Sequence, residues 1–371
     1  MEQSKGFRGY RVVAKTQESA VITSFGLQPV EQGAAAVFIP GQFLTLRLAD
    51  HEGVSVIRNY SLSGDPGNTS QWRISVKRES APVDRPDLPH GYASGFLHEQ
   101  TQVGDVLQLA GPMGAFTLDQ NSTRPVLLFS GGVGLTPMVS MLHWLSHNTA
   151  QPVYFIHACE NGSVHAMRDE VLELANRRPG IDVHFCYRNP SDQDLERGAC
   201  HSQGLIGRQT LQALLPLDDY EVYLCGPPQF MQVNWRLLRE LGISAERIHY
   251  EFFGPATVLR DEQQHLSQPT VAEPATPLHV DDSAAQASTV KFLPSGISIA
   301  WNPDCHSLLD LAEQAGLAPV FDCRAGICGT CQVGLRQGQV EYFEEPLEPS
   351  AQGAMLLCCS RPLGSVVVDL G

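Results

Sequence analysis

Hydrophobic and polar positions alternate with a short period along the first third of the chain. Strand-like runs such as YRVVAK, FLTLRL, RISVKR and VLQLAG are separated by turn-rich pieces such as GDPGNTS. Many short alternating runs joined by turns are typical of an antiparallel β-barrel. We therefore predict an antiparallel β-barrel domain over residues 1–122.

The pattern changes after residue 122, where apolar runs alternate with amphipathic stretches. PVLLFS, PVYFIHA, IDVHFCYR and YEVYLCG indicate buried strands, whereas MVSMLHWLS, MRDEVLELANRR and FMQVNWRLLRELG indicate helices. Strands that alternate with helices predict an α/β domain, in which helices cover both faces of a parallel sheet. We expect this second domain to span residues 123–255.

A third pattern begins after residue 255. Residues 256–288 are rich in Gln, Pro, Ala, Ser and Asp and poor in large apolar side chains, which is the composition of a mobile linker. Strand-like runs return over residues 289–371, with one helix-like segment, HSLLDLAEQAG. The sequence therefore predicts three domains, the last of them small and joined through a linker.

Charge and composition narrow the range of partners. The net charge of −15 argues against nucleic acid or an anionic membrane as a partner. No apolar run reaches the ~18 residues of a spanning helix, and the first residues, MEQSKGFRGYRVV, lack the apolar core of a signal peptide. We expect a cytoplasmic protein, in which ten cysteines serve as metal ligands, active-site residues or core residues rather than disulfides.

The last domain carries cysteines in a pattern of specific chemical meaning. Cys323, Cys328 and Cys331 follow the spacing C-x4-C-x2-C, and Cys358 comes later in the domain. Thiolates at this spacing are typical of a plant-type [2Fe–2S] cluster, whereas a zinc site would usually show two C-x2-C pairs. The sequence predicts the cluster, with Cys358 and Cys359 competing for the fourth ligand position.

Two segments of the barrel domain suit a flavin. In the first, a guanidinium could bind a pyrophosphate oxygen, a tyrosine ring could pack on the isoalloxazine, and a hydroxyl could reach the ring edge. Its residues are Arg58, Asn59, Tyr60 and Ser61. The second, from Gly91 to Ser94, resembles a loop that opens a short helix, where free N–H groups favour phosphate. Each segment alone is equally compatible with an ordinary strand or loop.

Two strand ends of the second domain suit a dinucleotide. In LFSGGVGLTPM, glycines follow a strand, Thr136 is expected as a helix N-cap and Pro137 as the first helical residue. The expected nucleotide contacts are Gly132, Val133, Gly134, Leu135, Thr136 and Pro137. In YLCGPPQFM, Cys225 and Gly226 stand where ligands of parallel sheets bind, although a buried strand cysteine is the ordinary alternative. Cys159 and Cys186 are interpreted in that ordinary way.

The order of these motifs resembles a known family. R-x-Y-S, GGVGLTP, CGPP and YEFFGP resemble the ferredoxin–NADP reductase superfamily, and HACENGSVHAMRDE, YRNPSD and IHYEFFGP are similar to the reductase half of flavohaemoglobins. Residues 289–371 resemble the β-grasp-like ferredoxin domain of phthalate-dioxygenase-type reductases. In that domain the last ligand directly follows an apolar run, here AMLL, so the resemblance selects Cys358 over Cys359.

The resemblance also implies cofactors and site residues. It implies FAD rather than FMN, held by Phe43, by the R-x-Y-S segment and by the segment after the last strand. That segment is Phe252, Phe253, Gly254 and Pro255. Ser61 and Cys225 would lie at the reacting centre, with Glu251 near the flavin in proton handling. The absence of a globin domain from this sequence leads us to expect neither haem nor nitric-oxide dioxygenase chemistry.

The implied activity is an electron relay from NAD(P)H through FAD and the cluster to an acceptor protein. Glu160 follows the second strand of the nucleotide domain without an arginine cluster for a 2′-phosphate, which favours NADH over NADPH. The preferred acceptor is a Rieske-type oxygenase, such as one that demethylates glycine betaine or carnitine. The alternatives are another metalloprotein, such as a hybrid-cluster protein, and a redox sensor or electron store.

Overall fold

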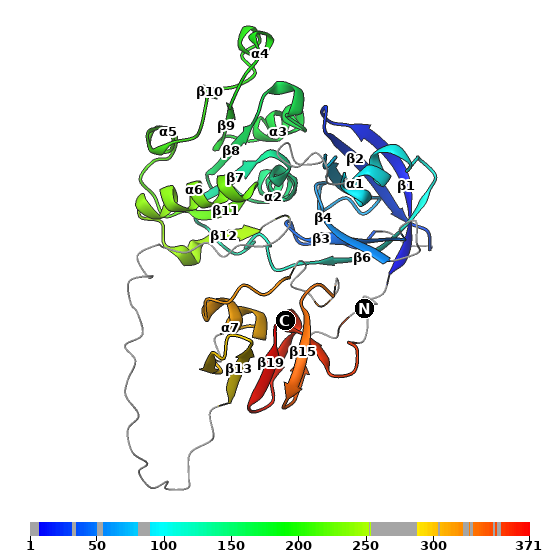
Figure 1. Ribbon diagram of the computed structural model, residues 1–371. Helices are drawn as coiled ribbons and strands as arrows, with labels where there is room; N and C mark the ends of the chain where they lie inside the picture. The colour runs from blue at the N-terminus through cyan, green and yellow to red at the C-terminus, as the bar shows by residue number, and fades with distance from the viewer. Residues whose placement is uncertain are drawn as a thin grey trace. The chain divides into compact units, whose positions relative to one another are not determined.

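The computed structural model describes most of the chain outside its predicted linker. The described residues are 7–31, 35–49, 55–80, 90–251, 253, 288–302, 305–321, 326, 329–343, 346 and 350–371. They belong to two compact units, Met1–Gly254 and Pro255–Gly371 (Figure 1). Nearly all of the predicted linker therefore lies outside the described residues. Among the described helices, none is long and apolar enough to span a membrane.

A six-stranded antiparallel sheet forms the first domain, with strand order β4-β3-β6-β1-β2-β5. Its strands are β1 (Arg8–Gln17), β2 (Ile22–Pro29), β3 (Phe43–Ala49), β4 (Ser55–Ser61), β5 (Trp72–Lys77) and β6 (Val106–Met113). An antiparallel bridge between Leu62 and Ile74 joins the end of β4 to β5 and closes the sheet. The predicted antiparallel barrel is confirmed.

Apolar side chains at alternating strand positions fill this barrel, as a period of two requires. Phe25, Leu27, Leu44 and Leu46 are all fully buried in one cluster. Helix α1 (Tyr92–Glu99) packs beside β5, and Gly91 is its N-cap. The expected short helix after Gly91 is therefore present.

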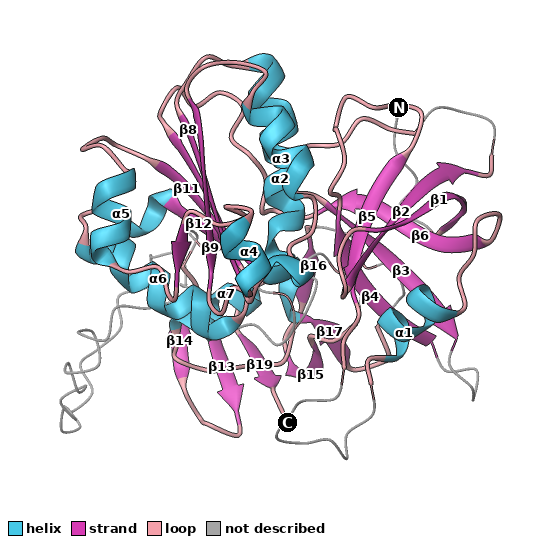
Figure 2. Ribbon diagram, turned by 90° about the horizontal axis from the view of Figure 1, so that it is seen from above, coloured by secondary structure: helices cyan, strands magenta, loops and turns pink. Residues whose placement is uncertain are grey.

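The second domain is a parallel sheet of six strands, in the order β10-β9-β8-β7-β11-β12. Figure 2 shows helices α2 and α3 on one face of this sheet and α5 and α6 on the other, as the alternating pattern predicts. The strands are β7 (Val126–Gly131), β8 (Val153–Cys159), β9 (Ile181–Tyr187), β10 (Ser202–Gln203), β11 (Glu221–Cys225) and β12 (Ile248–Glu251). The helices are α2 (Leu135–Asn148), α3 (Arg168–Ala175), α4 (Asp192–Glu196), α5 (Arg208–Leu214) and α6 (Pro228–Glu240).

In its described residues, the second unit is a small mixed sheet with one α-helix. Its five-stranded sheet has the order β14-β13-β19-β15-β17, and β16 and β18 form a separate pair. The only parallel pair among these described strands is β13 with β19, which is the arrangement expected of a β-grasp-like ferredoxin domain. The elements are β13 (Thr289–Leu293), β14 (Ser298–Ala300), α7 (Leu308–Gln314), β15 (Gln332–Gln337), β16 (Val340–Tyr342), β17 (Ala354–Leu356), β18 (Ser360–Pro362) and β19 (Val366–Asp369).

Candidate functional site

The order of the parallel strands reverses between β7 and β11. From β7 the chain continues to β8 and β9 on one side, whereas β11 and β12 lie on the other. Ligands of such sheets bind at the carboxyl ends of the strands where the order reverses. The register pairs Ser130 with Cys225, so the glycine-rich turn after β7 and the CGPP segment after β11 meet at this point.

Backbone meets backbone between these two segments. A Cβ atom on Gly134 would lie 2.3 Å from the carbonyl oxygen of Cys225 and 2.7 Å from the nitrogen of Gly226, so only glycine fits. Gly132 instead has a φ of +54° and open space where its side chain would be. The turn is therefore tight against β11 and open on the side where a pyrophosphate would approach.

Helix α2 begins earlier than the sequence pattern indicates. A 3-10 turn over Gly132–Gly134 continues directly into α2, so Gly134 is the N-cap and Leu135 the first helical residue. The prediction that Thr136 caps the helix is wrong, because its hydroxyl donates to the carbonyl of Val133 at 3.1 Å. Pro137 is the third helical residue rather than the first, a position where its missing N–H still costs no helical hydrogen bond.

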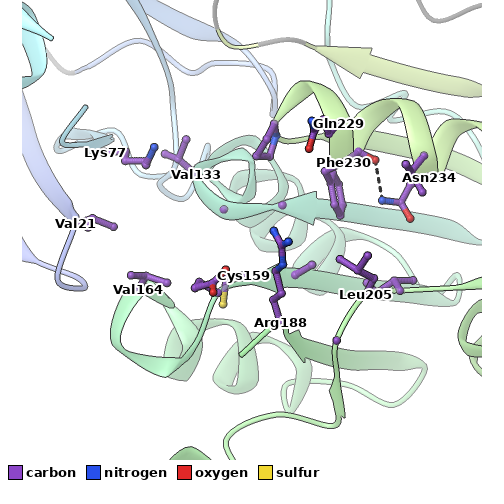
Figure 3. Close-up of a pocket in the computed structure, with 18 of the residues that line it drawn as sticks. Val21, Lys77, Val133, Cys159, Val164, Arg188, Leu205, Gln229, Phe230 and Asn234 are labelled. Atoms are coloured by element: carbon purple, nitrogen blue, oxygen red, sulfur yellow. Dashed lines mark hydrogen bonds between the residues drawn. The ribbon is translucent and has the colours of Figure 1, made fainter. Parts of the chain in front are cut away.

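A pocket of about 500 Å³ opens beside the glycine turn (Figure 3). This volume lies in the range of small-molecule sites. Leu205, Phe230 and Val233 give it an apolar wall suited to a planar base. In Figure 3, Phe230 from α6 and Arg188 from the end of β9 extend into the pocket from opposite sides.

Two side chains of opposite charge line the same pocket. Glu160 follows β8, and its carboxylate accepts a hydrogen bond from the side-chain amide of Asn189, while Arg188 follows the neighbouring strand β9. Glu160 was expected from the sequence, whereas Arg188 was not. The position of Arg188 directly after a predicted strand could have indicated it, because neighbouring parallel strands end at the same edge of a sheet. Cys159 also lines the pocket, and burial raises the pKa of its thiol to about 12, so it stays protonated.

The sequence-predicted Cys225 and Glu251 are paired in register at the ends of β11 and β12. Cys225 is fully buried. Burial, reinforced by the charge of Glu251, raises the pKa of the Cys225 thiol well above its ordinary value. Cys225 can therefore contact a ring as a neutral group but is not a nucleophile. Phe253 is 39% exposed, whereas Phe252, Gly254 and Pro255 lie outside the described residues.

On the barrel side, the predicted flavin residues Phe43 and Ser61 are paired across β3 and β4. The hydroxyl oxygen of Ser61 is buried and has no hydrogen-bond partner among the described residues. A buried hydroxyl without a partner is costly, so a polar ligand atom fits here. Phe43 packs closely on Gly114, where a Cβ atom would lie 2.9 Å from its ring. These observations fit a flavin ring edge at Ser61.

The four residues of the R-x-Y-S segment do not share one face of β4. Alternation places Arg58 and Tyr60 on one face and Asn59 and Ser61 on the other. Burial is the main cause of a raised pKa for Tyr60. Arg58, by contrast, is exposed. The side-chain oxygen of Asn59 accepts a hydrogen bond from the Thr45 hydroxyl at 2.8 Å, which joins β4 to β3.

The second predicted flavin segment is held by its own hydrogen bonds. The Ser94 hydroxyl accepts from the backbone N–H of Glu79 at 3.1 Å and donates to the carbonyl of Gly91 at 3.0 Å. A Cβ atom on Gly91 would lie 2.9 Å from the Cβ of Glu79 and 2.9 Å from the Oγ of Ser94. The structure therefore gives both residues a local role at the start of α1.

The predicted cluster ligands are described in part. Cys331 and Cys358 are buried, whereas Cys323 and Cys328 lie outside the described residues. The backbone N–H of Gly326, inside the cysteine loop, donates to the Sγ of Cys358 at 3.3 Å. Cys359 packs behind the same glycine, where a Cβ atom would lie 2.9 Å from its Sγ. N–H groups directed at ligand sulfurs are typical of iron–sulfur sites, so Cys358 fits the cluster better than Cys359.

Within the described residues no group of three or more histidine, cysteine or acidic side chains is arranged to hold a metal ion. Cys323 and Cys328, two of the four predicted ligands, lie outside those residues. The ligand set therefore stays a prediction from the sequence.

The barrel, the glycine-lined strand crossover and the ferredoxin-like unit together define a flavin- and nicotinamide-dependent oxidoreductase with an iron–sulfur domain. Three family descriptions match the chain in this order: an oxidoreductase FAD-binding domain over residues 10–118, an oxidoreductase NAD-binding domain over 128–234, and a 2Fe-2S iron-sulfur cluster binding domain over 290–363. The chain belongs to the ferredoxin–NADP reductase superfamily, with a flavohaemoglobin-type reductase followed by a [2Fe–2S] ferredoxin domain.

Curated relatives match the first two domains of the chain. The flavohemoprotein of Bacillus thuringiensis subsp. konkukian is 43% identical over 258 residues, 69% of this chain and 63% of the relative. The flavohemoprotein of Bordetella pertussis is 43% identical over 256 residues, 68% of this chain and 62% of the relative. This chain therefore spans less than two thirds of their length.

Similar solved structures cover either the first two domains or nearly the whole chain. The FAD/NAD-binding domain of nitric oxide dioxygenase from Vibrio cholerae is 37% identical, with a TM-score of 0.59 over 68% of this chain and 100% of that one. Phthalate dioxygenase reductase has a TM-score of 0.56 at 22% identity over 98% of both chains. The second likeness concerns the fold, and it includes the ferredoxin domain.

Proposed function

We propose that the protein is an NADH-dependent reductase that delivers electrons through FAD and a [2Fe–2S] cluster to a partner oxygenase. The main support is the presence on one chain of a glycine-lined dinucleotide crevice, a barrel with a free serine hydroxyl, and a ferredoxin domain. Phthalate dioxygenase reductase, which has this domain order, is described as a modular structure for electron transfer from pyridine nucleotides to [2Fe–2S].

In this proposal the glycine turn and the pocket bind NADH. The open side of Gly132 and the N-terminus of α2 receive the pyrophosphate, because free backbone N–H groups and the helix dipole favour anions. The adenine ring packs on Phe230 and Leu205. Glu160 accepts a hydrogen bond from the ribose 2′-hydroxyl, as acidic residues at this position of dinucleotide folds do.

In this proposal the residues that would hold FAD are Phe43, Tyr60 and Ser61 of the barrel, with Cys225 and Glu251 of the nucleotide domain facing it. When bound, FAD accepts two electrons as a hydride and the cluster carries one electron at a time, so the cofactors supply the chemistry. Ser61 donates its free hydroxyl to the ring edge, and Phe43 and Tyr60 bound the flavin. Cys225 stays neutral and packs against the nicotinamide, while Glu251 holds or releases a proton beside it.

Four cysteines would hold the cluster: Cys323, Cys328, Cys331 and Cys358. Substitution of Cys328 by serine should leave FAD bound and NADH-driven ferricyanide reduction largely intact, while cytochrome c reduction falls. Electron paramagnetic resonance of the reduced protein should show the cluster in the wild type and lose it in Cys328→Ser. Cys359→Ala, next to the fourth ligand, is the matched control and should keep the signal. Equal persistence of both activities in Cys328→Ser would remove the cluster from the electron path.

A Rieske-type oxygenase is the acceptor that we propose, such as one that demethylates glycine betaine or carnitine. The support is the oxygenase reductase with the same domain order. The test combines purified reductase, NADH and a Rieske oxygenase from the same cell, and follows demethylated product. Product formation that depends on the reductase is expected. Reduction of a hybrid-cluster protein without oxygenase turnover would replace this acceptor.

A further inference from the structure

A network of three side chains joins the barrel to the nucleotide domain. Arg73 of β5 donates two hydrogen bonds to the Glu170 carboxylate of α3, Nη1 to Oε2 at 2.9 Å and Nη2 to Oε1 at 2.8 Å. His143 of α2 lies with its Nε2 2.7 Å from Oε1 of the same carboxylate. We call this network the Arg73–Glu170–His143 bridge.

Both ends of the bridge lead to the proposed reaction site. Arg73 also donates from Nη2 to the carbonyl of Ser63 at 2.5 Å, two residues after the flavin-facing Ser61. His143 belongs to α2, whose first turn follows the glycine turn that faces the pyrophosphate. The bridge therefore connects the flavin segment to the helix that binds the nucleotide, although none of its three side chains lines the pocket.

The surroundings hold this network in one arrangement. The side chains of Arg73 and Glu170 are each 24% exposed, and that of His143 is 13% exposed. Burial would raise the pKa of the Glu170 carboxyl, but hydrogen bonds from His143 and Arg73 outweigh it and lower the pKa to about 2. Arg73 Nε and His143 Nδ1 are buried without hydrogen-bond partners among the described residues. Among the described residues, Glu170 is the only one whose side chain hydrogen-bonds to the side chain of Arg73 or His143, and the Arg73 side chain otherwise donates to the Ser63 carbonyl.

We infer that the Arg73–Glu170–His143 bridge positions the nucleotide-binding helix against the flavin segment and thereby sets the geometry of hydride transfer. This inference rests on the proposed function. The three residues act as positioning residues in this inference, because none of them lines the pocket. Transfer requires reacting atoms about 3–3.5 Å apart, and a shift of about 1 Å can cost a factor of about 100 in rate. The two hydrogen bonds from Arg73 to Glu170 join the two domains and can therefore fix that distance.

The test compares anaerobic flavin reduction by NADH in the wild type and in Glu170→Gln. The substitution keeps the side-chain size but removes the charge and one acceptor oxygen. We expect the limiting rate to fall by about tenfold or more, with FAD content unchanged and the dissociation constant of NADH changed by less than about twofold. A nicotinamide–flavin charge-transfer band, recorded with the non-reducing analogue tetrahydro-NADH, should weaken in parallel.

Two further variants separate positioning from general stability. Arg73→Lys keeps the charge but not the two-pronged geometry, and should give an intermediate rate and band. Glu99→Gln breaks the exposed Arg78–Glu99 ion pair of the barrel and should behave as wild type. If Glu170→Gln loses FAD or fails to fold, the limiting rate and the charge-transfer band of Arg73→Lys test the same prediction.

The outcomes distinguish the bridge from the proposed function. If neither NADH nor NADPH reduces the wild-type flavin, the proposed function is wrong. If the wild type is reduced while Glu170→Gln and Arg73→Lys keep its limiting rate and its charge-transfer band, the inference about the bridge is overturned. A fall in rate explained wholly by a higher dissociation constant for NADH would also overturn it.

Discussion

The backbone N–H of Gly326 donates a hydrogen bond to the Sγ of Cys358, 32 residues later in the chain, at 3.3 Å. Gly326 has a φ of +67°, and Cys359 fills the space where its side chain would be. Cys359 thus packs on Gly326 while the N–H of this glycine donates to the preceding cysteine, Cys358. Hydrogen bonds to cluster sulfurs tune the reduction potential, so this pair of contacts leads to a first prediction.

Gly326→Ala should shift the cluster potential to more negative values. The added methyl group meets Cys359 at 2.9 Å and moves the N–H away from Cys358, which removes stabilisation of the more negative, reduced cluster. A lost hydrogen bond of about 1 kcal/mol corresponds to a shift on the order of 50 mV for one electron. A redox titration followed by electron paramagnetic resonance measures it. Gly353→Ala, also at positive φ but in open space, is the control and should leave the potential unchanged.

Gly134→Ala should weaken NADH binding without loss of FAD. Its Cβ atom would lie 2.3 Å from the Cys225 carbonyl, so the glycine turn and β11 must separate. We expect the dissociation constant of NADH to rise at least tenfold, or about 1.4 kcal/mol. Fluorescence titration measures it, and Gly207→Ala, which meets no atom within 4 Å, is the control. Unchanged NADH affinity would remove this turn from the site.

Ser61→Ala should have opposite effects in the apoprotein and the flavoprotein. The Ser61 hydroxyl is buried without a partner among the described residues, so its removal should leave the FAD-free protein equally stable or more stable. In the FAD-bound protein the same change removes a hydrogen bond to the ring, and flavin reduction should slow. Thermal unfolding of both forms and stopped-flow reduction provide the measurements. A destabilised apoprotein would contradict this interpretation of Ser61.

Glu170 should add stability that depends on pH. Its folded pKa of about 2 lies below the ordinary value of 4.5, so the carboxylate stabilises the fold above about pH 4.5, and this contribution is lost as the pH falls toward 2. At neutral pH it should be worth on the order of 2 kcal/mol, after allowance for its partial exposure. Urea unfolding of wild type and Glu170→Gln at several pH values checks this. The difference should narrow in acid, and a constant difference would exclude linkage to Glu170.

Glu160 and Arg188 should control the choice between NADH and NADPH. Both line the pocket and carry opposite charges, so Glu160→Gln should weaken NADH binding and reduce the penalty against a 2′-phosphate. Arg188→Ala should lower the use of NADPH more than that of NADH. The ratio of kcat/KM for the two coenzymes is the measurement. A ratio unchanged in both variants would place the adenosine elsewhere.

Local pattern predicted most of the fold because period and turn chemistry are local properties. The alternation in FLTLRL and RISVKR appears as β3 and β5, and the apolar run YEVYLCG appears as β11. The start of α2 was mispredicted at Thr136, because a 3-10 turn over Gly132–Gly134 leaves no local signature that separates it from a loop.

Features that depend on distant residues could not be read from the sequence. Arg188 reaches the pocket because β9 ends beside β8, and Arg73 meets Glu170 across 97 positions. Neither neighbour is implied by spacing along the chain. The pairing of Phe43 with Ser61, by contrast, agrees with the flavin roles assigned to both through resemblance.

The bridge between Leu62 and Ile74 has a consequence for the order of assembly. Ser61 immediately precedes the residue that closes the barrel, so its hydroxyl reaches its buried position only when the first and last strands of the sheet have met. A partly folded chain with an open barrel would lack this contact. We therefore expect flavin uptake to be a late event in maturation, and the yellow colour of the protein to report that its N-terminal domain is completely folded.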